Sequence, residues 1–193
     1  MRPLSRAIFA IAAASLTLSA VACTPVDYSE FYEVDGELTR VVLSVDEGSL
    51  EVVGSDREGV SVLRDVQGWE GNLSLETRVV DGVLFITASC EGVLRCQVDS
   101  VVEVPAGVEV EARVGRGSLT VSGLQGITDL SVGEGELVGW NLSPVYGTAT
   151  VGVGSVELEL VEEVPVSVAI GHGDVALLGE TARVDVLGVG ALR

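Results

Sequence analysis

The chain has 193 residues, with 29 acidic residues, 11 arginines and no lysine, which gives a formal net charge of −18. Hydrophobic residues make up 47% of the chain, aromatic residues only 4%, and there are 24 glycines. So acidic a protein repels nucleic acid and anionic lipid headgroups, which excludes nucleic acid as a partner. Abundant glycine in an apolar chain indicates a β-rich fold with many turns rather than a disordered protein.

The first 22 residues predict a secretory signal peptide. Two arginines precede an uncharged apolar stretch over residues 7–22, which is too short and wrongly flanked for a stable membrane span. The stretch ends Ala20-Val21-Ala22-Cys23. This ending resembles the bacterial lipoprotein signal, in which the cysteine is lipidated and becomes the first mature residue, although Ala20 stands where leucine is more usual. The alternative is ordinary secretion with an unmodified Cys23.

Lipidation of Cys23 would hold the protein at a membrane through its N-terminus. Removal of residues 1–22, with Arg2 and Arg6, takes the net charge from −18 to −20, and acyl chains at about 0.8 kcal/mol per buried methylene overcome that charge. By resemblance to enterobacterial sorting, Thr24 does not signal inner-membrane retention. The expected location is therefore the bacterial cell envelope, at the outer membrane or cell surface. Residues 23–35 are predicted to form the lipidated N-terminus and a tether to one domain over residues 36–193.

Short alternating runs ahead of residue 105 predict antiparallel hairpin strands. The dipeptide Asp81-Gly82 separates two such runs, Leu73–Val80 and Val83–Ala88, and is a strong hairpin signal. Cys90 and Cys96 follow, and two cysteines this close in an exported protein predict a disulfide. The alternative, a redox or metal pair, lacks the CxxC spacing and further zinc ligands.

Residues 114–192 repeat a Gly-x-Gly phrase. The first glycines of successive phrases are 18, 19, 19 and 17 residues apart, and apolar residues alternate with polar ones around each phrase. Period-two alternation predicts strands, and glycine between them suits a sharp corner. Repeats this small cannot bury an apolar face alone, so they must stack into a β-solenoid with a column of glycines. The predicted corner glycines are Gly115, Gly117, Gly133, Gly135, Gly152, Gly154, Gly171, Gly173, Gly188 and Gly190.

Two runs resemble the bacterial putative-adhesin family of exported β-solenoid domains. They are Cys96-Gln-Val-Asp-Ser-Val-Val-Glu-Val-Pro105-Ala-Gly107-Val-Glu-Val and Gly117-Ser-Leu-Thr-Val-Ser-Gly123-Leu, followed by the repeated corners. The Val-Pro-x-Gly turn and the Gly-[Ser/Asp]-[Leu/Val] phrases carry the resemblance, which covers about residues 36–193. It implies an all-β domain of the right-handed, single-stranded β-helix type, and it brings no catalytic or binding residues with it.

The sequence predicts no catalytic residue, no cofactor and no metal site. His172, the only histidine, lies in the middle of a corner where the other copies vary freely, so it is expected to be an exposed turn tip. The phrases are not dinucleotide fingerprints, because a strand rather than a helix follows the glycines. If the corners stack, an outward column with two carboxylates forms and could at most bind calcium loosely. Its members are Ser118, Glu136, Ser155 and Asp174.

These features favour a lipid-anchored envelope protein whose solenoid is a non-catalytic interaction, adhesion or structural surface for an envelope or extracellular protein or glycan. One alternative is an exported glycan-active enzyme on a β-helix, and another is an accessory factor in envelope stress sensing. Polysaccharide-cleaving β-helices need basic residues and sugar-stacking aromatics, and the repeat has only Trp140 and Tyr146. These two either form a small sugar-stacking patch or cover the solenoid flank.

Overall fold

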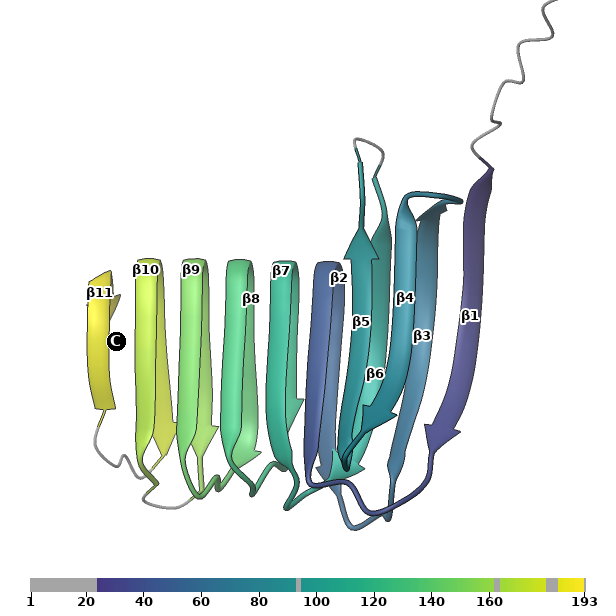
Figure 1. Ribbon diagram of the computed structural model, residues 1–193. Helices are drawn as coiled ribbons and strands as arrows, with labels where there is room; N and C mark the ends of the chain where they lie inside the picture. The colour runs from purple at the N-terminus through teal and green to yellow at the C-terminus, as the bar shows by residue number, and fades with distance from the viewer. Residues whose placement is uncertain (1–23, 93–94, 162–163, 180–183, 193) are drawn as a thin grey trace, which may run out of the picture.

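The computed structural model describes residues 24–92, 95–161, 164–179 and 184–192, and in these ranges the chain is all-β without a helix. Its strands belong to one hydrogen-bonded sheet in the order β1-β3-β6-β2-β7-β8-β9-β10-β11, with β5 and then β4 attached to β2 (Figure 1). The predicted signal peptide and Cys23 lie outside the described residues. Within these ranges the structure contains no helix that could cross a bilayer.

The repeat forms a ladder of parallel strands. It comprises β2 (Arg40–Ser55), β7 (Glu109–Ser122), β8 (Thr128–Leu142), β9 (Gly147–Leu160), β10 (Val166–Gly179) and β11 (Val184–Leu192). Each strand pairs in parallel with the next, and Gly117 lies opposite Gly135, which in turn lies opposite Gly154. One sequence repeat therefore corresponds to the step from one strand of the sheet to the next. The phrase Asp46-Glu47-Gly48, which lacks a first glycine, is an additional corner, because Gly48 lies opposite Gly117.

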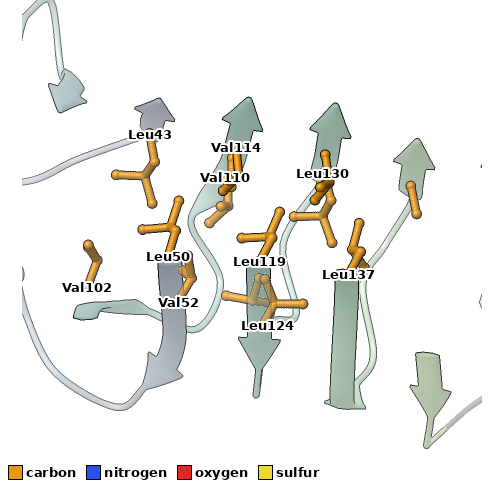
Figure 2. Close-up of a cluster of buried hydrophobic side chains, with 14 of the residues drawn as sticks. Leu43, Leu50, Val52, Val102, Val110, Val114, Leu119, Leu124, Leu130 and Leu137 are labelled. Atoms are coloured by element: carbon orange, nitrogen blue, oxygen red, sulfur yellow. The ribbon is translucent and has the colours of Figure 1, made fainter. Parts of the chain in front are cut away.

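Each of the strands β2 and β7–β10 turns back on itself at its glycine corner, which folds the sheet into two layers (Figure 1). We call the part of each strand before the corner its first arm and the part after it the second arm. Buried side chains of the two arms point toward one another, for example Leu130 from a first arm and Leu137 from a second arm (Figure 2). The core is thus a set of Val, Leu and Ala ladders between the layers, built by the period-two alternation.

Five further strands extend the two layers at the N-terminal end. β6 (Gln97–Pro105) pairs with the second arm of β2, and β3 (Val60–Trp69) and β1 (Pro25–Val34) follow it in antiparallel pairs. β5 (Val83–Cys90) pairs with the first arm of β2, and β4 (Leu73–Val80) pairs antiparallel with β5. The predicted hairpin is confirmed: both of its turn residues have positive φ, 51° at Asp81 and 78° at Gly82.

The predicted tether over residues 23–35 is wrong for most of its length. Residues 25–34 form β1, which pairs with β3 along its whole length. The physical reason is that Tyr32 and Val34 pack against the end of the core, which would otherwise be open. β3 continues to Trp69, which lies opposite Pro25, so the turn into β4 is confined to residues 70–72.

The final corner is less regular than the others. The pairing of β10 with β11 shifts register between Ala169 and His172 and then resumes with Gly173 opposite Gly190. Gly188 and Gly190 both belong to β11. The shorter spacing of 17 residues between Gly171 and Gly188 therefore coincides with a break in the register of the ladder.

Candidate functional site

The glycine corners form a continuous ridge, here called the corner ridge. The second glycine of each of the first four phrases, together with Gly48, has φ between 138° and 144°, and these glycines stand in register across the sheet. They are Gly48, Gly117, Gly135, Gly154 and Gly173. A Cβ on Gly135 would lie 1.7 Å from the carbonyl oxygen of Gly117, and one on Gly154 would lie 1.7 Å from that of Gly135. Positive φ and direct backbone contact both require glycine at these positions.

The first glycine of each phrase is required for a different reason. Gly115, Gly133, Gly152 and Gly171 have no positive φ, but a Cβ on Gly133 would lie 2.4 Å from the carbonyl oxygen of Gly115. The same close approach to the preceding turn occurs at Gly152 and Gly171. The glycines that dominate the repeat therefore have a packing role.

A disulfide joins Cys90 at the end of β5 to Cys96, just before β6, with 5.8 Å between their Cα atoms. It connects the two layers in the turn that has no Gly-x-Gly phrase. Val98 lies directly behind the corner ridge here, because a Cβ on Gly48 would lie 2.1 Å from the Val98 carbonyl oxygen. The backbone N–H of Cys90 also donates to Asp46 Oδ2 at 3.0 Å. The disulfide thus replaces a glycine corner.

We expect the Cys90→Ser/Cys96→Ser double variant to lose about 2.4 kcal/mol of unfolding free energy, since a loop of about seven residues gives that value in the chain-entropy model. Urea unfolding followed by circular dichroism measures the loss. Glycine corners further along the chain do not depend on this bond, so hydrogen exchange in β9 should remain slow under native conditions. Equal stability of the variant and the parent would show that the disulfide does not constrain the unfolded chain.

Two open hollows flank the corner ridge. One, of about 790 Å³, lies on the second-arm side and is lined by Asp99 and by the column predicted from stacking, of which Ser118, Glu136 and Ser155 belong to the lining. The other, of about 580 Å³, lies on the first-arm side beside Arg116. Arg116 binds Glu47 at 3.5 Å and Glu134 at 3.4 Å.

Three carboxylates in these hollows are bonded within the protein. Asp99 Oδ1 accepts from the backbone N–H and hydroxyl of Ser49 at 2.8 and 2.6 Å, and its Oδ2 accepts from Gln97 at 2.8 Å. Glu47 and Glu134 share one guanidinium rather than facing each other across a gap for a sugar, which is the arrangement that glycoside hydrolysis uses. Among the described residues no group of three or more His, Cys, Asp or Glu side chains could bind a metal ion.

His172 and the two aromatic residues of the repeat lie apart from one another. His172 is exposed at its corner, opposite Val153. Trp140 is 41% exposed and lies opposite Ser122 in a second arm, whereas Tyr146 is 46% exposed and immediately precedes the first arm of β9. Outward side chains of the two arms face opposite sides of the molecule. Trp140 thus belongs to a second arm, and Tyr146 to the turn before the next first arm.

Among the described residues, one exposed apolar cluster on a strand surface was not predicted from the sequence. Phe31, Leu63 and Val101 lie side by side in register on β1, β3 and β6, on the outer side of the sheet, with exposures of 64%, 45% and 37%. We call these three residues the apolar row. A signal existed in the strand alternation, because Leu63 on β3 and Val101 on β6 each occupy the outward phase of their strand, which otherwise carries polar residues.

An arginine clamp closes one side of the apolar row. Arg57, from the turn before β3, binds Glu103 at 2.6 Å and Glu33 at 3.0 Å, and these two acidic residues flank the row on β6 and β1. The hydrogen bond to Glu103 and the nearby Glu33 raise the pKa of the Arg57 guanidinium. The clamp therefore links β1, β3 and β6 through a guanidinium that stays protonated across the physiological pH range.

Comparison with known proteins gives structural likeness only. No protein-family model matches the chain, and no curated protein matches its sequence. It is similar to a "putative cell adhesion protein" from Clostridium sporogenes, with 15% identity, 86% of this chain and 97% of that chain covered, and a TM-score of 0.48.

Two solved structures from Parabacteroides distasonis are also similar. For a "putative adhesin" the identity is 14%, the coverage 89% of this chain and 97% of that chain, and the TM-score 0.28. For a "putative lipid binding protein" the identity is 10%, the coverage 85% and 95%, and the TM-score 0.33. Such low similarity leaves the function of this chain to be inferred from its own residues.

Proposed function

We propose that this protein is a lipid-anchored component of the bacterial cell envelope, and that its domain is a right-handed β-solenoid acting as a non-catalytic interaction surface. The signal-like N-terminus ending at Cys23 supports the anchor, and the parallel ladder with a one-turn offset supports the solenoid. Right-handed winding is inferred from Figure 1, where the first arms run upward in front and the turns advance toward the C-terminus at the left.

The apolar row is the observation that carries the interaction role. Its three side chains lie on an open sheet face rather than at a loop tip, and Phe31 is 64% exposed. Contiguous apolar side chains on the surface of a soluble domain mark interaction sites more often than scattered ones do. The extended strands around the row offer a broad, rigid surface of the kind that repeat proteins use for binding.

β1 makes the proposed anchor short. Only Thr24 separates Cys23 from Pro25 at the start of β1, so the lipid and the first strand are at most about 7 Å apart along the chain. The β1 end of the folded sheet is therefore expected to lie close to the membrane, with the ladder extending away from it.

Mass spectrometry of the protein from its native membrane fraction tests the anchor. We expect a mature chain that begins at Cys23 and carries a diacylglyceryl group. We also expect the Cys23→Ser variant to move from the membrane fraction to the soluble exported fraction, because acyl burial supplies the attachment. Cys90→Ser, which removes a cysteine that the structure pairs, is the control and should stay at the membrane. An unmodified Cys23 in a membrane-free protein would refute the anchor.

A further inference from the structure

The register of the strands divides the outward side chains into two faces. We call the outer side of β1, β3, β6 and the second arms of β2 and β7–β10 the acidic face. The outer side of β4, β5 and the first arms is here called the mixed face. The strand pairing fixes which side chains share a face, and therefore which charged residues belong to each face.

On the mixed face three of the acidic residues are paired with arginine, whereas Asp129 accepts a hydrogen bond from the Thr148 hydroxyl at 2.5 Å. Arg40 binds Glu109 at 3.3 Å and also binds Glu111, and Arg113 binds Glu111 at 2.6 Å. On β4, Arg78 binds Glu76 at 3.1 Å. Each of these three carboxylates therefore has its own arginine partner.

On the acidic face the balance is different. Arg57 is the arginine that binds carboxylates there, and it pairs with Glu33 and Glu103. Within the part of the chain that the structure describes, the other carboxylates of this face form no ion pair. They are Asp27, Glu51, Asp65, Asp99, Glu136, Glu157, Glu159 and Asp174.

The apolar row lies inside this acidic surface. Asp65 follows Leu63 by two residues on the same side of β3, and Glu51 lies directly opposite Val101. Neighbouring strands are about 4.8 Å apart, so these carboxylates lie within one side-chain length of the row. An occupant must therefore cover an apolar strip and supply positive charge beside it.

We propose that the acidic face is a docking site for a cationic amphipathic segment of another protein, whose apolar side chains cover Phe31, Leu63 and Val101 while its Lys or Arg side chains meet Asp65 and Glu51. The proposal names the partner chemistry of the interaction surface proposed above and rests on that function. Charge complementarity selects this occupant, since a second copy of this face or an anionic lipid surface would add like charge. A neutral glycan would bring no positive charge to these carboxylates.

Fluorescence anisotropy with a labelled peptide of alternating Lys and Leu tests the proposal. The full chain carrying Cys23→Ser serves as the protein, so the result does not depend on whether Cys23 is lipidated. We expect saturable binding that weakens with added salt. A peptide of alternating Lys and Ser should bind at least about tenfold more weakly, because it cannot cover the apolar row.

Matched variants locate the binding. Phe31→Ser/Leu63→Ser should weaken binding about tenfold, whereas Ile127→Ser/Val145→Ser, which alters residues 46% and 72% exposed away from the acidic face, should leave it within about twofold. Asp65→Asn/Glu51→Gln should weaken binding about tenfold, whereas Asp129→Asn/Glu76→Gln makes the same charge change on the mixed face and should not. Thermal unfolding of each variant checks that the fold is retained.

Three results would overturn the proposal. Equal losses from both charge variants would mean attraction to net charge alone, and equal binding of the two peptides would mean that the apolar row does not participate. Binding of a neutral polysaccharide, competing with the peptide and abolished by Phe31→Ser/Leu63→Ser, would assign the face to glycan instead. Any of these three results is compatible with a lipidated Cys23, and an unmodified Cys23 is compatible with peptide binding to the acidic face. The anchor and the docking site can therefore be refuted independently of each other.

Discussion

Replacing Gly135 with alanine is expected to lower the free energy of unfolding by about 4 kcal/mol. Two costs add. A φ of 141° strains any residue with a Cβ, and that Cβ would lie 1.7 Å from the Gly117 carbonyl oxygen, which belongs to the hydrogen-bonded backbone of β7 and cannot yield cheaply. The neighbouring turn is affected as well, because each turn of a repeat is stabilised mainly by its two neighbours. Urea unfolding of the purified protein measures the loss.

Alanine substitutions at Gly133 and Gly107 separate the cost of positive φ from the cost of close packing. At Gly133, φ is not positive but a Cβ would lie 2.4 Å from the Gly115 carbonyl oxygen, so Gly133→Ala should cost less, about 2 kcal/mol. At Gly107 no atom lies within 4 Å and φ is not positive, so Gly107→Ala should change stability by about 0.5 kcal/mol or less. A Gly135→Ala protein as stable as Gly107→Ala would disprove the close packing of the corner ridge.

Replacing Arg64 with alanine is expected to cost about 3 kcal/mol. Arg64 points inward from β3, and its side chain is only 2% exposed. Its guanidinium donates to Glu30 at 3.0 Å and to the Tyr32 hydroxyl at 2.9 Å, and Tyr32 hydrogen-bonds Thr77 of β4 at 2.7 Å. Removal of the arginine leaves a cavity and deprives a half-buried carboxylate of its cation, which costs more than an exposed pair contributes.

The loss should be concentrated at the first strand. Trp69 lies opposite Pro25, so its fluorescence reports on the attachment of β1, and hydrogen exchange in β1 should accelerate before that in β8. Arg64→Met, which keeps the apolar stem, should lose less than Arg64→Ala. The matched carboxylate variants are Glu30→Gln and Glu33→Gln; Glu33 is 55% exposed, so its loss should stay below about 1 kcal/mol. Equal effects of Glu30→Gln and Glu33→Gln would contradict a stabilising buried pair.

The repeat could be predicted from the local sequence pattern, because the recurring glycines mark both the position of each corner and the length of each repeat. Glycine must recur wherever the backbones of successive turns approach to contact distance, as Gly117, Gly135 and Gly154 do. The alternation on each side of a glycine then assigns inward and outward residues. The hairpin at Asp81-Gly82 was equally readable, because its turn needs two positive φ values, which these residue types supply.

The strand β1 at the N-terminal end could not be predicted in the same way. Residues 25–34 are polar, contain a proline at the start and have no repeat, so their own pattern suggested a tether. They become a strand because β3 offers an open edge and because Tyr32 covers the end of the core. That partner lies more than 25 residues away along the chain, and antiparallel register over such a distance has no local signal.

The proposed interaction surface shows the same division between local and tertiary information. Composition and alternation already predicted an acidic, β-rich chain. Alternation, however, says only which residues share a side within one strand, and not which side of the molecule that is. The arginine pairs of the mixed face, and the meeting of Phe31, Leu63 and Val101 among unpaired carboxylates of the described acidic face, depend on cross-strand register between segments far apart in sequence. Register is a property of the packed sheet, because burial of the inward ladders on both arms is what selects it.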